Sequence, residues 1–274
     1  MTENDFLLSP EEKWERLTLS NNFIFYKIMR SHPDACRELL ELLLKVRIER
    51  LSLAAEDSIG VDYGAKSVRL DVFVQDESRI FDVELQVANT KELPERARYY
   101  QAVMDVDSLK AGELYRELKD SHVIFLCMSD VIGCGLPVYT FENRCRERTD
   151  IALNDRAYKH FFIAPTCATM LTDAEQRAFF TLLTENRAES RFAERLSAYI
   201  NDARHNTQWR MQYMTWERQQ AYAFRDGQER GAARTRFETA QRMLAKGTYA
   251  VAEVAEICGL SVAEVKKCAS KPSL

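Results

Sequence analysis

Two carboxylic acids stand out in residues 68–87, VRLDVFVQDESRIFDVELQV, because of where they would meet: Asp71 and Glu84. Apolar residues alternate along both halves of this stretch, which predicts two half-buried strands joined by a tight turn. If the chain pivots between Glu77 and Ser78, Asp71 lies directly opposite Glu84. Directly opposed like charges destabilise a sheet. A divalent cation between the two carboxylates would remove this repulsion.

The chemistry of such a site would be metal-assisted hydrolysis. Mg²⁺ favours carboxylate and water oxygens, and a bound metal can activate water for attack on phosphorus. Asp82 and Gln86 share the face of Glu84, so an amide would lie beside the metal. The alternative is a solvated hairpin face with ordinary surface charges. A lone D…ExQ pattern is weak, and by itself it favours this simpler interpretation.

Three helices are predicted before the hairpin. Ser9-Pro10-Glu11-Glu12 is a capping box with proline at the first helical position, and it predicts a short helix to about residue 17. Residues 21–29 form a second predicted helix. Residues 33–45 form an amphipathic third, whose apolar stripe we assign to the core. Residues 46–53 are predicted to form a strand.

A helix and further strands follow the hairpin. Pro94 opens a predicted helix that runs to about residue 109. The continuous apolar run HVIFLCM, residues 122–128, is typical of a central strand buried on both faces. Residues 138–142 and 160–164 are further strand candidates. Strands mixed with helices in this order predict an α/β fold, with a mixed central sheet flanked by helices.

The C-terminal part is predicted to be mostly helical. A second capping box, Thr172-Asp173-Ala174-Glu175, opens a long region rich in Arg and Glu, with expected breaks near Asn201 and Gly227. Residues 236–269 resemble a helix-turn-helix, although the last helix offers lysines rather than base-reading side chains. Packing or self-association through these helices is the alternative role. We therefore expect three parts: residues 1–170, 171–232 and 233–274.

Composition limits the possible partners and compartment. The chain has 274 residues, 46% of them hydrophobic, with a net charge of −4 and a pI of about 5.8. A nucleic-acid surface would therefore have to be local. No apolar run approaches the roughly 20 residues of a membrane span, and the acidic N-terminal segment lacks a signal-peptide core. Seven cysteines without CxxC spacing fit reduced thiols. We expect a cytoplasmic protein that does not enter a membrane.

Several segments, taken in order, resemble the recombination-promoting nuclease / putative transposase family within the PD-(D/E)XK nuclease superfamily. The resemblance runs from about residue 15 to 165 and rests on many short matches rather than on one motif. The matching segments are LSNNFIFYKIM (19–29), RLDVFV (69–74), DVELQ (82–86), PERARYYQAVMD (94–105), LKDSHVIFLC (118–127), GLPVYTFENRC (135–145) and LND (153–155).

The resemblance implies a metal-dependent DNA endonuclease with a PD-(D/E)XK-type fold. It makes Asp71 and Glu84 the ligands of Mg²⁺ or Mn²⁺, joined by the Leu85 carbonyl. Gln86 stands where the superfamily usually has lysine, as is usual in this family. An amide donates and accepts hydrogen bonds but carries no charge. Gln86 can position a water molecule, whereas the metal would be mainly responsible for activating that water.

One position departs from the family, and others are assigned supporting roles. Asn22 stands where an acidic residue is expected, and an amide is a poorer ligand for a hard cation than a carboxylate. Glu56 is an auxiliary candidate, with an ordinary charged loop position as the alternative. Gln101 is expected in the cleft. Arg96 is preferred to Arg98 for facing DNA, because helical geometry groups it with the tyrosines. The DNA-binding candidates are Lys27, Arg96, Arg98, Tyr99 and Tyr100.

Three hypotheses follow, and the first two belong to different classes. The first is an endonuclease that leaves a 5′ phosphate and promotes recombination or the movement of mobile DNA. The second is a degenerate nuclease fold that binds DNA or a protein without cutting, motivated by Asn22 and the acidic net charge. A third hypothesis gives the long helices and the tail a role in homo-oligomer formation.

Overall fold

The computed structural model describes residues 8–53, 58–59, 68–69, 71–88 and 90–269. Three helices come first: α1 (Pro10–Glu15), α2 (Asn22–Ser31) and α3 (Pro33–Leu44). The strands are β1 (Ser52–Leu53), β2 (Ser58–Ile59), β3 (Val68–Arg69), β4 (Val72–Gln75), β5 (Arg79–Gln86), β6 (Asp120–Cys127), β7 (Val138–Phe141) and β8 (Ala157–Ile163). The remaining helices are α4 (Leu93–Ser108), α5 (Ala164–Met170), α6 (Ala174–Glu185), α7 (Arg191–Arg204), α8 (Thr207–Lys246), α9 (Val251–Cys258) and α10 (Val262–Ala269).

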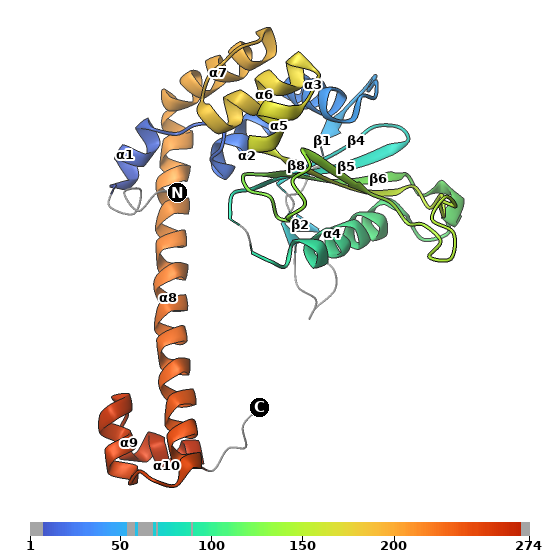
Figure 1. Ribbon diagram of the computed structural model, residues 1–274. Helices are drawn as coiled ribbons and strands as arrows, with labels where there is room; N and C mark the ends of the chain where they lie inside the picture. Colours follow the sequence, from blue (N-terminus) through green and yellow to red (C-terminus); the bar gives the residue numbers. More distant parts are fainter. Residues whose placement is uncertain (1–7, 54–57, 60–67, 70, 89, 270–274) are drawn as a thin grey trace. The chain divides into compact units, whose positions relative to one another are not determined.

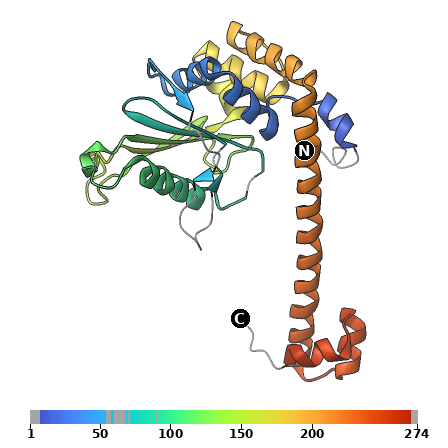
Figure 2. The same cartoon turned by 180° about the vertical axis from the view of Figure 1, so that it is seen from behind.

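A six-stranded mixed sheet forms the centre, in the order β1-β4-β5-β6-β8-β7. The pairs β5–β6 and β6–β8 are parallel, and the other pairs are antiparallel. Parallel neighbours need a crossover connection, and α4 lies in the one between β5 and β6. Helix α4 covers one face of the sheet, while α2, α3, α5, α6 and α7 gather on the other (Figures 1 and 2). The predicted α/β fold, with its helical C-terminal region, is confirmed.

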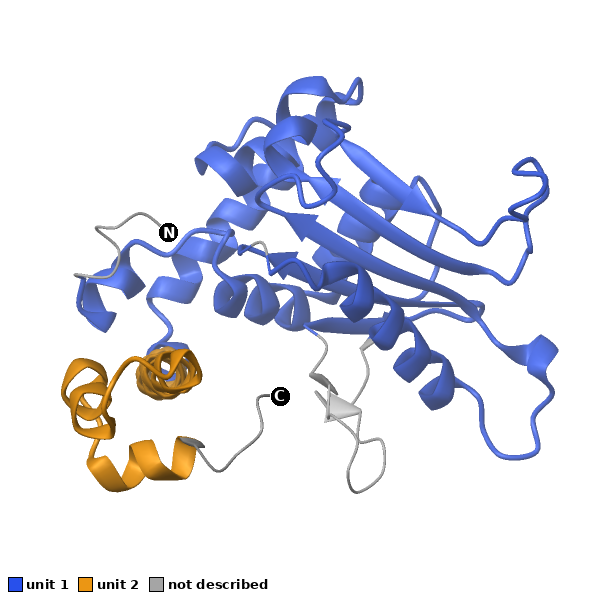
Figure 3. Ribbon diagram, turned by 60° about the horizontal axis from the view of Figure 1, so that its bottom comes forward, with its two compact units in different colours: residues 1–210 blue, residues 211–274 orange. Residues whose placement is uncertain are grey.

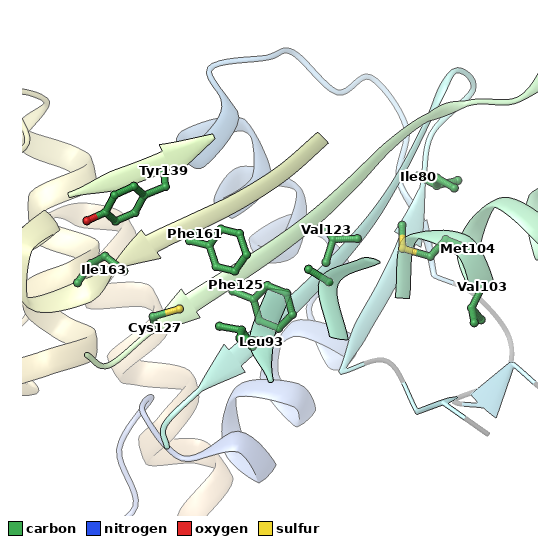
Figure 4. Packing of buried hydrophobic residues seen from close by; sticks show 11 residues of the cluster. Ile80, Leu93, Val103, Met104, Val123, Phe125, Cys127, Tyr139, Phe161 and Ile163 are labelled. Atoms are coloured by element: carbon green, nitrogen blue, oxygen red, sulfur yellow. The ribbon is translucent and has the colours of Figure 1, made fainter. Parts of the chain in front are cut away.

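An apolar cluster fills the space between α4 and the sheet (Figure 4). Its residues come from α4 and from strands β5, β6, β7 and β8. Strand β6 is buried from Ser121 to Cys127, which confirms its predicted central position. Burial of this cluster fixes α4 over β5. The buried members are Ile80, Leu93, Ala97, Val103, Met104, Val123, Phe125, Cys127, Tyr139, Phe161 and Ile163.

The early part of the chain differs in places from the prediction. Within the expected strand 46–53, only Ser52 and Leu53 pair, with β4. The first arm of the hairpin is also shorter than expected: β3 pairs with β2 in a separate two-stranded sheet, and β4 begins only at Val72. The α1 capping box at Ser9 and Glu12 is confirmed, as is the amphipathic helix α3.

Of the two breaks expected in the long helical region, one is present. The break expected near Asn201 lies at residues 205–206, between α7 and α8, whereas α8 runs without a break through Gly227. A glycine inside a helix costs only about 1 kcal/mol, so it does not by itself end one. The observed stop after α6 is at Asn186, whose φ of 55° is left-handed. Helix α6 is capped by Asp173, not by Thr172.

The chain divides into two compact units, residues 1–210 and 211–274 (Figure 3). The three-part division expected from the sequence stays a prediction. In the second unit, Gly247 and Gly259 follow helix ends with positive φ, and Ser261 with Glu264 forms the predicted capping box. Its core joins α8, α9 and α10 through Ala240, Val254, Ala255, Cys258 and Val265. Within the described ranges, no helix combines the length and apolar character that a membrane crossing requires.

Candidate active site

The turn between β4 and β5 sets the register of the hairpin. The Asp76 carboxylate accepts from the backbone N–H groups of Ser78 at 2.9 Å and Arg79 at 2.6 Å. Its other oxygen accepts from Arg79 Nε at 2.8 Å. The pairs that follow, from Gln75–Ile80 to Val72–Val83, place the next pair at Asp71 and Glu84. The predicted pivot is therefore confirmed.

Asp71 and Glu84 are in direct contact through the backbone. The Asp71 amide N–H donates to Glu84 Oε1 over 2.8 Å. Asp71 lies in a bend immediately before β4 and is partly exposed, whereas Glu84 retains only 4% of its exposed surface. The Glu84 side chain is thus buried in the sheet, whereas Asp71 lies just before the start of β4 and is partly accessible to solvent.

The polar face of β5 is not solvated, so the simpler interpretation of the hairpin is wrong. Asp82, Glu84 and Gln86 are 0%, 4% and 7% exposed. The whole of β5 from Ile80 onward is buried, because β6 pairs along one edge and α4 covers this face. Period-two alternation indicates half-burial, but it could not show that a helix lies over the polar face.

Arg96 brings a positive charge into this buried face from α4. Its two terminal nitrogens contact Gln86 Oε1 at 2.7 Å and Glu84 Oε2 at 3.3 Å. Nε and one terminal nitrogen also donate to the Tyr100 hydroxyl, at 3.3 and 3.1 Å. The guanidinium carbon lies 5.3 Å from the centroid of the Tyr100 ring and 5.7 Å from that of Phe125. Arg96 therefore joins the acid, the amide and the aromatic side chains.

Burial and the neighbouring acids both disfavour the charged form of the carboxyl groups in this site. Burial, and then the charge of Asp71, raise the pKa of Glu84 to about 8. Burial raises the pKa of Asp82 well above its usual range, and the charges of Glu84 and Asp71 add to this effect. Arg96 opposes both shifts. Among the residues that the structure describes, three acidic groups therefore share one nearby arginine.

Asp82 is the residue whose importance the sequence analysis missed. Neither carboxylate oxygen has a hydrogen-bond partner, although the side chain is fully buried. Ionised carboxylates are acceptors only, so Asp82 and its neighbour Glu84 can bond to each other only if one holds a proton. The signal was available, since Asp82 shares the period-two face of Glu84.

The donor set fits a hard divalent cation. It consists of oxygens, it includes three acidic side chains that repel one another when ionised, and neither oxygen of its most buried carboxyl group, that of Asp82, has a hydrogen-bond partner. The Gln86 carbonyl accepts from the Met128 amide on the β6 side. Carbonyls alternate along a strand, so the Leu85 carbonyl points to the opposite side, that of Asp71. In the part of the chain that the structure describes, no ready-made cluster of three or more Asp, Glu, His or Cys ligands occurs.

The other predicted residues of α4 divide into two groups. Tyr100 is half-buried beside Arg96, while Tyr99 is 36% exposed and Arg98 is exposed. Gln101 is not a cleft residue: it is buried, donates to the Ser121 carbonyl at 3.1 Å and accepts from Lys159. It follows Ala97 on the core-facing side of α4, so it links the helix to β6 instead of contacting Glu84.

The remaining candidates lie on the N-terminal helices or outside the described residues. Asn22 is the first residue of α2, after the cap formed by Asn21, and α2 contacts β4. Lys27 lies on the same helix, with its amine 5.6 Å from the centroid of the Phe23 ring. Glu56 falls outside the residues that the structure describes.

Comparison with known proteins relates part of the chain to a family. No curated protein and no solved structure matches the chain. A family model does match, over the segment that runs from the cap of α2 to just beyond β7 and includes every strand of the hairpin. Residues 21–144 match the model of the family described as PD-(D/E)XK nuclease family transposase, so this part of the chain is similar to that family.

Proposed function

We propose that the protein is a metal-dependent endonuclease that hydrolyses phosphodiester bonds in DNA. The observation that carries the proposal is the pairing of Asp71 with Glu84, two residues before Gln86, in a buried acidic site. The site lies inside the segment that matches a nuclease and transposase family. That family supports DNA as the substrate and a divalent metal as the cofactor.

Each residue has a defined task in this proposal. Asp71, Glu84 and the Leu85 carbonyl would hold Mg²⁺ or Mn²⁺. The ion would supply a Lewis acid for the developing charge on phosphorus and help to activate water. Gln86 would orient the attacking water through its amide, without taking a proton from it. The water oxygen bonds to phosphorus, the bond to the 3′ oxygen breaks, and the 5′ phosphate stays on the product.

Residues around the acids supply candidate DNA contacts. Arg98 and Tyr99 are exposed on α4, where arginine can grip a phosphate and tyrosine can stack on a base. Arg96 and Tyr100 would contact the DNA nearer to the scissile bond, and Lys27 would contact the DNA backbone from α2. Recombination or the movement of mobile DNA is the cellular role that we propose for this cleavage.

Cleavage of supercoiled plasmid in Mg²⁺ or Mn²⁺ tests the proposal. We expect Asp71→Ala and Glu84→Ala to reduce nicking by at least about 100-fold, since each removes a proposed metal ligand. Asp107→Ala is the matched control, because it removes an exposed carboxylate from the end of α4 and should leave nicking unchanged. Circular dichroism verifies folding. Full activity in folded Glu84→Ala would refute the proposed site.

A second candidate function is binding of DNA or protein without cleavage. It is favoured by Asn22 in a position where the family resemblance leads us to expect an acid, and by the ion pair that Arg96 makes with Glu84. Calorimetric titration with Mg²⁺ separates the candidates, because the binding-only protein should show no Asp71-dependent heat. If the wild type does not cut, Asn22→Asp should restore cutting in a nuclease that lacks one ligand. Continued inactivity would favour binding alone.

We further propose a cytoplasmic location and self-association through the C-terminal helices. All seven cysteines lie in the described residues and none forms a disulfide, which fits a reducing compartment. Helix α8 exposes 56% of Tyr222 and 57% of Phe224, and a second copy could cover them. Light scattering of the full chain tests this, with Phe224→Glu expected to lower the measured mass.

A further inference from the structure

Arg96 lies where a metal ion at Glu84 would have to compete with it. Both oxygens of Glu84 are already in use: Oε1 accepts from the Asp71 amide, and Oε2 contacts Arg96. The guanidinium also bonds to Gln86 Oε1, the atom that would orient water. A cation shared by Asp71 and Glu84 would place a second positive charge beside the guanidinium.

We infer that Arg96 is exchanged for the metal: it neutralises Glu84 in the free protein and turns to a DNA phosphate when the metal takes its place. This inference rests on the proposed metal-dependent function. Arg96 then has two positions. In the first it occupies the acidic site, and in the second it helps to hold the substrate.

The surroundings of Arg96 allow such a movement. Its side chain is 29% exposed, whereas that of Glu84 is 5% exposed, so the arginine is the partner with access to solvent. Its charged end lies over the rings of Tyr100 and Phe125, which provide a flat surface along which it can turn. Arginine has a planar fork of donors that suits phosphate as well as carboxylate. Arg96 therefore has a suitable anionic partner in both positions, a carboxylate in the first and a phosphate in the second.

The exchange couples metal binding to DNA binding. A phosphate that attracts Arg96 frees Glu84 and Gln86, and a metal at Glu84 frees Arg96 for the phosphate. Coupling between two ligands is reciprocal, so each should raise the affinity for the other. The free protein would then hold metal weakly and gather its cofactor mainly on DNA.

Calorimetric titration with Ca²⁺, which shares the oxygen ligands of Mg²⁺, tests the exchange without relying on catalysis. We compare the wild type, Arg96→Met, Arg96→Lys and Glu84→Ala, with and without a short DNA duplex checked for integrity on a gel. A pH of 9 limits competition from the proton. Arg146→Met is the charge-matched control, because Arg146 is exposed in a loop after β7.

Without DNA, we expect Arg96→Met to bind Ca²⁺ about tenfold more tightly than the wild type, equivalent to about 1.4 kcal/mol. DNA should raise the Ca²⁺ affinity of the wild type by a similar factor and that of Arg96→Met by much less. Arg96→Lys should fall between them, because lysine keeps the charge but lacks the fork. Arg146→Met should behave like the wild type.

The outcomes separate this inference from the proposed function. If Glu84 is needed for Ca²⁺ binding and Arg96→Met binds no more tightly than the wild type, the exchange is refuted while the metal site stands. If neither the wild type nor Arg96→Met binds Ca²⁺ through Glu84, the metal site itself is refuted, and the exchange with it. Tighter binding by both Arg96→Met and Arg146→Met would reduce the effect to net charge and refute the exchange.

Discussion

Acidification should destabilise the protein through a pair of buried histidines on the sheet. His122 Nδ1 lies 3.1 Å from His160 Nε2, and His160 Nδ1 lies 3.2 Å from the Thr140 hydroxyl. The two histidines are 9% and 8% exposed, and His122 stacks on Phe81 and on Tyr158. Burial lowers the pKa of His122 to about 3, with His160 and Arg79 contributing, and lowers that of His160 to about 4.

The sign and size of the effect follow from proton linkage. Each histidine has a lower pKa when folded than its usual 6.5, so the unfolded chain binds more protons between the two values. Stability is therefore full above pH 6.5 and falls as the pH decreases below it. Lowering the pH from 7 to 5 should reduce the free energy of unfolding by about 2 kcal/mol for each histidine, because each contributes about 1.4 kcal/mol for every pH unit below 6.5. The two histidines together should reduce the free energy of unfolding by about 4 kcal/mol.

Urea unfolding of the wild type and of the double variant His122→Asn/His160→Gln measures this loss. The replacements keep polar atoms near the bonded nitrogens but do not titrate. We expect the fall in unfolding free energy from pH 7 to pH 5 to be about 4 kcal/mol smaller in the variant, since other titrating groups cancel in the comparison. Equal losses in both proteins, or histidine NMR signals that titrate near pH 6.5, would refute the reasoning.

Two further predictions concern the acidic site. Because the pKa of Glu84 is raised to about 8, Mg²⁺ affinity should increase between pH 6 and pH 8, by up to about tenfold per pH unit as the competing proton is lost; a flat calorimetric profile would contradict this. Asp82→Asn should gain unfolding free energy relative to the wild type as the pH rises from 5 to 8, because the buried wild-type carboxyl resists ionisation while the unfolded one ionises. Urea titrations at both pH values provide the test, and a gain that does not change with pH would count against it.

Local sequence patterns predicted the hairpin register, the capping boxes at Ser9 and Ser261, and the central strand β6. In each case the deciding interactions lie within a few residues, or in one continuous apolar run. The pairing of Asp71 with Glu84 belongs to this group, because turn chemistry alone determines it.

The predictions failed where distant parts of the chain decide the outcome. Gln101 and Arg96 lie on the same helix, yet the first bonds to Ser121 and the second to Glu84. Only the docking of α4 on the sheet separates them. The burial of Asp82 depends on the same docking, so no alternation pattern within β5 could reveal it. Likewise, Gly227 permits a helix break but does not impose one.

The turn at Asp76 and Arg79 has a consequence for how this protein can change. Surface turns usually tolerate insertions and deletions. Here, a change of one residue would shift the pairing of β4 and β5 and turn one arm over, since side chains alternate with a period of two. Asp71 would then no longer face Glu84, although neither acid had been replaced. The length of this turn is therefore as much a part of the site as its carboxylates.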